Sequence, residues 1–240
     1  MKRPAAPWIA CLLGIAGAAA IALPARSEPP PLAGPADPEP LHTVMHGHFN
    51  ALREVHRALL FGDLKKARRS ARDLAEMTAP GGLPGWEASV ARIRETASRL
   101  TRTRSARQAR RLVAELAVEC GDCHQDSADV SRFAGESEPF DDGSAAGRMA
   151  RHEWAAGSVW LGLIGPSQDL WQVGLTALAS PPLLPDAFTD DRERYQRVDA
   201  LSRRMAVLAA RARSLDDDQA QAAAFADLLG VCAGCHQLTR

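Results

Sequence analysis

The sequence lacks most of the features by which enzymes and nucleic-acid-binding proteins are identified. It contains no Ser-His-Asp set, no Gly-rich phosphate loop and no basic surface with interleaved aromatic residues, so no nucleic-acid partner is expected. Aromatic residues make up 5% of its 240 residues, the formal net charge is zero, and β-branched residues are few. Alanine, leucine and arginine dominate instead, which favours helix nearly throughout and predicts an all-α fold.

Cysteine is also scarce, and its positions are informative. Four of the five cysteines lie in Cys120-Gly-Asp-Cys123-His124 and Cys232-Ala-Gly-Cys235-His236. Two cysteines three apart on a helix point the same way, so both sulfurs can reach the vinyl groups of one porphyrin, and the next residue offers an imidazole to its iron. The C-x-x-C-H pattern therefore predicts two covalent haem c groups. A zinc site or a redox disulfide is the alternative, but neither requires the two His residues.

The N-terminal segment predicts export. Two basic residues precede an unbroken apolar run from Trp8 to Leu23, and Ala25-Arg26-Ser27 supplies the small residues of a cleavage site. We expect a signal peptide over residues 1–27, which includes Cys11. An uncleaved membrane anchor is the alternative, although 16 apolar residues are few for a span. Export agrees with c-type haem attachment, which occurs outside the bacterial cytoplasm, so a periplasmic location is expected.

Composition then divides the remaining chain. Residues 28–40 form a Pro-rich linker, and an acidic linker over residues 126–144 separates two haem modules, residues 41–125 and 145–240. Residues 41–124 carry 15 Lys or Arg against 9 Asp or Glu. This basic excess indicates either a docking face for an acidic redox partner or an ordinary solvated helix surface.

The two modules align as copies of one unit. At an offset of 104 residues, Met45 aligns with Met149, and at an offset of 112 residues the two haem motifs coincide. An eight-residue insertion, placed around residues 181–188, accounts for the change of offset. A tandem duplication explains the match.

Each module is predicted to contain four helices. Gly, Pro and capping residues separate them, including Ser105 with Gln108, Ser167, and Asp190 with Glu193. The expected helices of the first module are His42–Phe61, Asp63–Met77, Trp86–Thr103 and Ala106–His124. Those of the second are Ala145–Ile164, Gln168–Ala179, Asp191–Arg213 and Asp216–His236. The core expected for the first module is Leu52, Val55, Leu59, Leu64, Leu74, Val90, Ile93, Leu100, Leu112 and Leu116.

The residue opposite His124 and His236 on each iron decides the chemistry, because a six-coordinate iron transfers electrons and an open iron binds gases or peroxide. Met45 and Met149 are candidate sixth ligands, since thioether sulfur suits low-spin haem iron. His48 and His152 lie three residues later on the same helix face and are the alternatives. Three other histidines have no counterpart in the second module and are expected at the surface or at helix ends: His42, His46 and His56.

This arrangement resembles the cytochrome c-prime family, specifically its Met-ligated low-spin members. The resemblance rests on the C-x-x-C-H runs ending each fourth helix and on Met45 and Met149 near the start of each first helix. It implies two tandem four-helix bundles, each carrying one covalently bound haem c, over nearly all of residues 41–240. Family members often dimerise through their first two helices, which makes a homodimer a candidate assembly.

The expected function is therefore that of a periplasmic dihaem c-type cytochrome, an electron-transfer protein rather than an enzyme, that carries electrons between redox partner proteins. The alternative is a haem enzyme or sensor, such as a peroxidase or a nitric-oxide binder, with an open iron site. A third option is a haem subunit of a membrane oxidoreductase complex.

Overall fold

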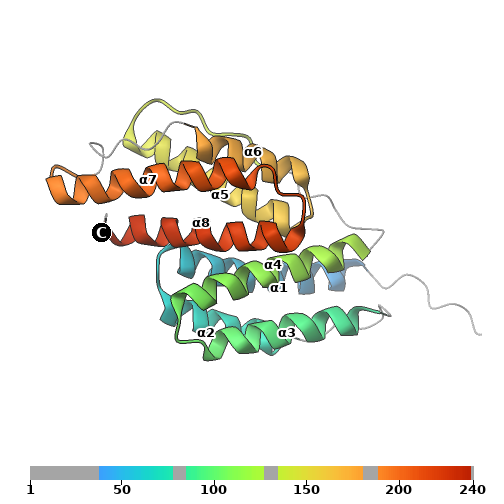
Figure 1. The fold of residues 1–240 in the computed structure, drawn as a ribbon. Helices are drawn as coiled ribbons and strands as arrows, with labels where there is room; N and C mark the ends of the chain where they lie inside the picture. The colour runs from blue at the N-terminus through green and yellow to red at the C-terminus, as the bar shows by residue number, and fades with distance from the viewer. Residues whose placement is uncertain (1–37, 78–84, 127–134, 181–188, 239–240) are drawn as a thin grey trace, which may run out of the picture. The chain divides into compact units, whose positions relative to one another are not determined.

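The computed structural model describes residues 38–77, 85–126, 135–180 and 189–238. The predicted signal peptide, most of the linker 28–40 and the predicted insertion at 181–188 lie outside these ranges. Within them, all regular secondary structure is α-helical, which confirms the all-α prediction (Figure 1). The helices are α1 (Pro38–Leu60), α2 (Leu64–Ala75), α3 (Trp86–Arg102), α4 (Ala106–Asp126), α5 (Ala145–Ile164), α6 (Gln168–Ala179), α7 (Arg192–Ala212) and α8 (Asp218–Leu238).

The helix boundaries agree with the sequence prediction to within a few residues because side-chain caps set many of them. Asp63 caps α2 through the backbone N–H of Lys66, and Ser167, its counterpart at an offset of 104, caps α6 through Leu170. One predicted cap is wrong. Asp191, and not Asp190, accepts the hydrogen bond at the start of α7, from the backbone N–H of Arg194.

Helices α4 and α8, which carry the two C-x-x-C-H motifs, begin with equivalent caps. Ser105 accepts a hydrogen bond from the Gln108 backbone N–H, and Asp217 accepts one from Ala220. The predicted capping box at Ser105 is only half formed, because the Gln108 side chain accepts a hydrogen bond from the Thr103 hydroxyl rather than bonding to the Ser105 backbone. Both helices thus start at a local signal and reach their C-x-x-C-H motifs in their last turns.

Helices adjacent in sequence pack against one another. Here the first half denotes α1–α4 and the second half α5–α8. In the first half α1 packs on α2, α2 on α3 and α3 on α4, and α1 also contacts α4. The second half repeats this order, and α5 contacts α8. All eight helices belong to one compact unit, residues 36–240.

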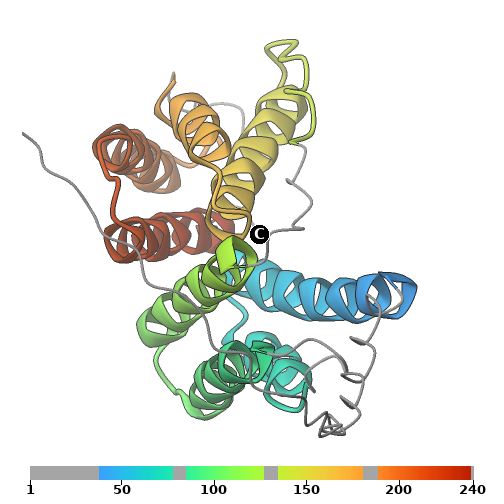
Figure 2. The same ribbon diagram turned by 90° about the vertical axis from the view of Figure 1, so that its right-hand side faces the viewer.

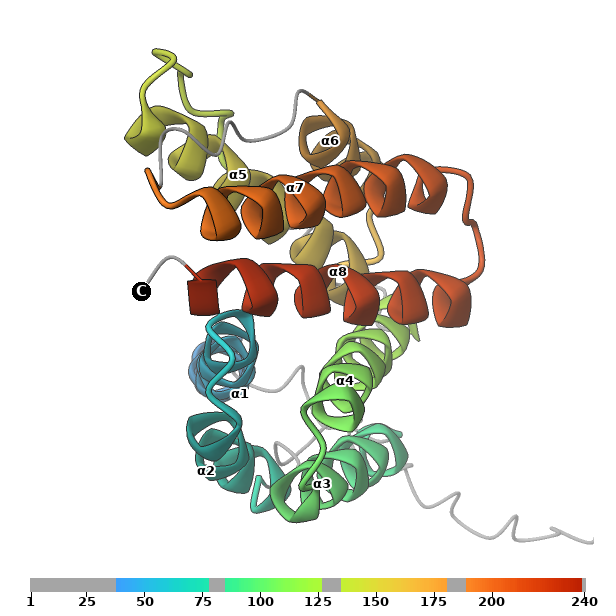
Figure 3. The same ribbon diagram turned by 60° about the vertical axis from the view of Figure 1, so that its left-hand side comes forward.

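Helices α4 and α8 join the two halves (Figures 1 and 3). Two further contacts flank this central pair: α1 with α8, and α4 with α5. Figure 2 shows the end of α4 beside both α1 and α5. Since α1 corresponds to α5 and α4 to α8, each interface contact has its equivalent in the other half. The pattern of contacts between the two halves is therefore symmetric.

A single apolar core extends through both halves. Every predicted core residue of the first half belongs to it, and all are buried except Leu64, which is partly buried against it. None of the helices in the described part of the chain is long and apolar enough to cross a membrane.

Three aromatic rings meet where the halves join. His56 of α1 stacks on Trp160 of α5 with ring centroids 4.4 Å apart and planes inclined by 10°. Phe225 of α8 lies 5.4 Å from Trp160 and 5.7 Å from His56. His56 is 7% exposed, so its predicted surface position is wrong, whereas His42 and His46 are exposed as expected. His56 and Trp160 are equivalent at the offset of 104, so two copies of one position contact each other.

Candidate haem-attachment sites

The first C-x-x-C-H motif lies in the last two turns of α4. Cys120, Cys123 and His124 are all partly buried, and neither cysteine forms a disulfide. Gly121 within the motif is buried. The helical spacing predicted from the sequence is thus present, with two thiols three residues apart and the imidazole next to the second.

The second motif occupies the equivalent end of α8. Cys232 is buried, Cys235 and His236 are partly buried, and neither cysteine forms a disulfide. Burial raises the pKa of Cys120 and of Cys232 to about 12, and it also raises that of Cys235. The motif cysteines in α4 and α8 therefore occupy similar environments.

The donor set suits haem attachment better than the two alternatives. None of the four motif cysteines is disulfide-bonded, and thioether formation with vinyl groups requires reduced thiols. In the described ranges, no three or more His, Cys, Asp or Glu side chains are grouped as a metal site. A zinc site needs four such ligands converging on one point. The residue types and spacing of each motif are those that haem attachment uses.

His124 makes a hydrogen bond to the other half. Its Nδ1 lies 2.8 Å from the carbonyl oxygen of Ile164, the last residue of α5. His236 lies edge-on to the ring of Phe61, just beyond the end of α1, with centroids 4.6 Å apart. Each motif histidine therefore contacts the end of the first helix of the opposite half.

The candidate sixth ligands lie in the first halves of α1 and α5. His152 is close enough to His236 for the two to interact electrostatically, and burial, His236 and Arg151 together lower the pKa of His152 to about 4. Burial also lowers the pKa of His48. Met45 and Met149 are partly buried one turn earlier. Of the candidate sixth ligands, His152 is the one whose pKa is affected by a motif histidine.

Glu119, directly before the first motif, was not identified from the sequence. Its Oε1 accepts a hydrogen bond of 2.8 Å from the Thr96 hydroxyl, and its Oε2 is buried without a partner. Burial, and to a smaller degree the neighbouring Glu115, raise its pKa to about 7. The equivalent residue of the second half is the buried Val231. A comparison of the two aligned motifs, position by position, would have identified this carboxyl, because the residue differs between the two halves.

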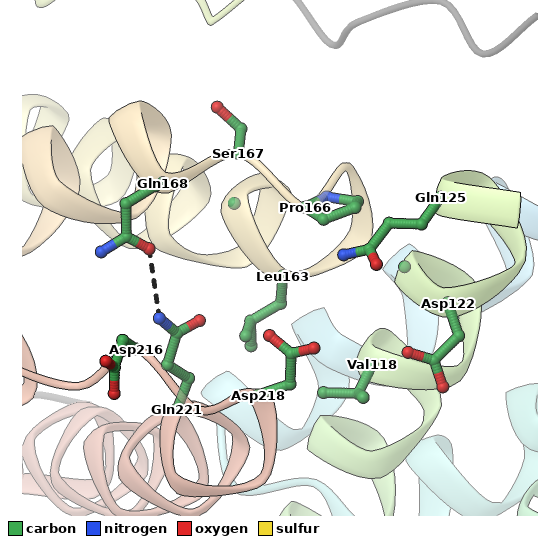
Figure 4. Close-up of a pocket in the computed structure, with 12 residues that line it drawn as sticks. Val118, Asp122, Gln125, Leu163, Pro166, Ser167, Gln168, Asp216, Asp218 and Gln221 are labelled. Atoms are coloured by element: carbon green, nitrogen blue, oxygen red, sulfur yellow. Dashed lines mark hydrogen bonds between the residues drawn. The ribbon is translucent and has the colours of Figure 1, made fainter. Parts of the chain in front are cut away.

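A small cavity of about 110 Å³ lies beside the first motif (Figure 4). It is lined by Gly121, Asp122 and Gln125 of α4 and by the α5–α6 and α7–α8 turns. Cofactor pockets usually enclose about 300–1,000 Å³, so this cavity is too small for a porphyrin. Gly121 and Asp122, which lie between the two cysteines in the sequence, line this cavity. The cavity therefore lies on the face of α4 that packs toward α5.

Comparison with known protein families, curated proteins and solved structures finds no match for this chain. The functional assignment therefore depends on the chain's own residues and their placement.

Proposed function

We propose that this protein is an exported dihaem c-type cytochrome that carries electrons between redox partner proteins in the periplasm. In this proposal α1–α4 and α5–α8 are tandem four-helix haem modules similar to the cytochrome c-prime family. The observation that carries it is the repeated set of two partly or fully buried cysteines without a disulfide and a partly buried His at equivalent ends of α4 and α8.

The cysteine and histidine side chains of each motif would have different roles in holding a haem. Cys120 and Cys123 would hold one haem through thioether bonds, and Cys232 and Cys235 the other. His124 and His236 would be the proximal ligands. When bound, haem supplies an iron that accepts and releases one electron, so electron transfer requires no substrate-binding site in the protein.

For the sixth ligand, we propose Met45 or His48 in the first module, and Met149 or His152 in the second. The lowered pKa of His152 keeps its imidazole neutral near pH 7, as a metal ligand requires. Near-infrared spectra of the oxidised protein separate the two, because a Met–iron charge-transfer band is absent from a bis-His haem. His152→Ala should alter the spectrum of one haem if His152 is the ligand, and Met149→Ala is the matched control.

Intact-mass analysis after maturation in a host that attaches c-type haem tests the proposal. We expect two haems per chain in the native sequence and one in each of the paired variants Cys120→Ala with Cys123→Ala and Cys232→Ala with Cys235→Ala. A polypeptide recovered bare or loaded with zinc would contradict the proposal. Rapid carbon monoxide binding to the reduced protein would instead indicate an open iron and hence an enzyme or sensor.

A further inference from the structure

The hydrogen bond between His124 and Ile164 links the first haem motif to the second half of the chain. A carbonyl oxygen can only accept, so His124 Nδ1 must carry the proton in this 2.8 Å contact. The Nε2 lone pair of the same ring is then the one left to bind a metal. A metal-binding His commonly donates its second ring N–H in this way, which orients the ring and raises its basicity.

We propose that the Ile164 carbonyl is the positioning group for His124, so that the first haem site is completed by the second half of the chain. This inference rests on the proposed haem attachment. His124 is the iron ligand, and Ile164 acts through it without contacting the iron. The two halves are therefore not independent haem modules.

The position of Ile164 explains why its carbonyl is available. The last four carbonyls of an α-helix have no intrahelical partner, and Ile164 is the last residue of α5. Partial negative charge accumulates at this end of a helix, so an N–H donor is favoured there. The chain then turns at Gly165 and Pro166, and Pro166 has no backbone N–H to compete with His124.

Gly121 allows α4 to approach the end of α5 this closely. A methyl group at Gly121 would lie 2.5 Å from the carbonyl oxygen of Leu163, a backbone atom that can yield only if α5 moves. The second motif carries Ala233 at the equivalent position, and His236 contacts the Phe61 ring. The close approach that places Ile164 against His124 thus depends on a glycine specific to the first motif.

Nitrogen-15 NMR of the haem-loaded full chain, labelled at histidine, observes the proposed bond directly. We expect His124 Nδ1 to be protonated and its proton to exchange slowly with solvent. A His124 Nδ1 that is unprotonated, or whose proton exchanges as fast as that of an exposed histidine such as His42, would overturn the inference.

Gly121→Ala tests the role of the bond in tuning the haem. Loss of the acceptor should lower the basicity of His124, raise the reduction potential of one haem only, and speed exchange of its Nδ1 proton. Ala233→Gly, the reverse change in the second motif, should leave that potential unchanged. If Gly121→Ala leaves both potentials and the exchange rate as in the native protein, the inference is wrong.

The two proposals fail in distinguishable ways. Absence of haem from correctly matured protein contradicts the proposed function. Two haems per chain with normal spectra, but a freely exchanging His124 Nδ1 proton, contradict only the positioning role of Ile164. If Gly121→Ala does not fold, the exchange measurement on the native chain still decides the question.

Discussion

The two halves of this protein have the same order of helices but are packed with side chains of different size. In α2 the core positions Ala67 and Ala71 are filled by methyl groups, whereas the equivalent positions of α6 hold Trp171 and Leu175. All four are fully buried. A duplicated backbone therefore tolerates a large change in core volume, provided that the neighbouring helices adjust their separation.

The halves also differ around their haem motifs. The first has the carboxyl of Glu119 and the small Gly121 where the second has Val231 and Ala233. His56 and Trp160, again equivalent, meet face to face at the interface. The attachment residues proposed for the two motifs are the same while their surroundings differ, so the two haems of the proposal are expected to differ in potential. The following predictions test how far the difference extends.

The largest effect is expected from Trp171→Ala. The side chain is 1% exposed and its indole N–H donates to the Ala212 carbonyl at 3.3 Å, so truncation leaves a cavity and removes this buried hydrogen bond, although the carbonyl keeps its bond from the Leu215 N–H. We expect a loss of about 3–5 kcal/mol in the free energy of unfolding, measured by denaturant titration. Ala67→Gly at the equivalent position should cost only about 1 kcal/mol. Equal losses would mean that the two halves do not differ in core packing as described.

The second prediction concerns acid stability at the interface. Burial lowers the pKa of His56 from 6.5 to about 4, so the folded state resists protonation, and the stability present above pH 6.5 is lost as the pH falls toward 4. His56→Phe keeps a ring against Trp160 and should reduce this loss by up to about 3 kcal/mol. Unfolding curves at pH 7 and pH 4 measure this loss of stability in the native protein and in the variant. The exposed His42→Phe is the control, and an acid loss as large in His56→Phe as in the native protein would contradict the prediction.

A smaller effect is expected where α5 and α6 approach each other. A methyl group at Gly174 would lie 2.6 Å from the carbonyl oxygen of Ala155, while one at Gly157 of α5 meets nothing within 4 Å. Gly174→Ala should cost about 1–3 kcal/mol through overpacking. Gly157→Ala should instead stabilise the protein by about 0.5–1 kcal/mol, because alanine is the better helix former. Thermal unfolding of both variants measures these changes in stability. If Gly174→Ala stabilises the protein, α5 and α6 are not in close contact at this position.

The smallest effect concerns Glu119. Its raised pKa means that the folded state holds a proton between pH 4.5 and about 7, so its contribution to stability is fully present below pH 4.5 and is lost as the pH rises through 7. Because the carboxyl is partly exposed, Glu119→Gln should remove only about 1 kcal/mol of this pH dependence. Denaturant titrations at pH 5 and pH 8 measure the free energy of unfolding of Glu119→Gln. The control is Glu95→Gln, since Glu95 is an exposed residue of α3. Identical pH dependence in Glu119→Gln and the native protein would contradict the prediction.

Most of the local structure was predictable from the sequence. The spacing of Cys120, Cys123 and His124 on one helical turn depends only on helix geometry, and caps such as Ser105 and Ser167 act within four residues. The same reasoning misplaced His56, because burial of a single polar residue depends on which helix packs over it. It also missed Glu119, since no local pattern distinguishes a buried carboxyl from a solvated one.

The sequence by itself determined the helices, their order and the two duplicated motifs, because hydrophobic periodicity, capping and the C-x-x-C-H spacing are properties of short segments. Only the tertiary structure decided which residues meet across the halves: His124 with Ile164, His236 with Phe61, and His56 with Trp160. These partners lie 40 to 175 positions apart in the sequence. Such contacts follow from the packing of α4 against α8, which no local pattern encodes.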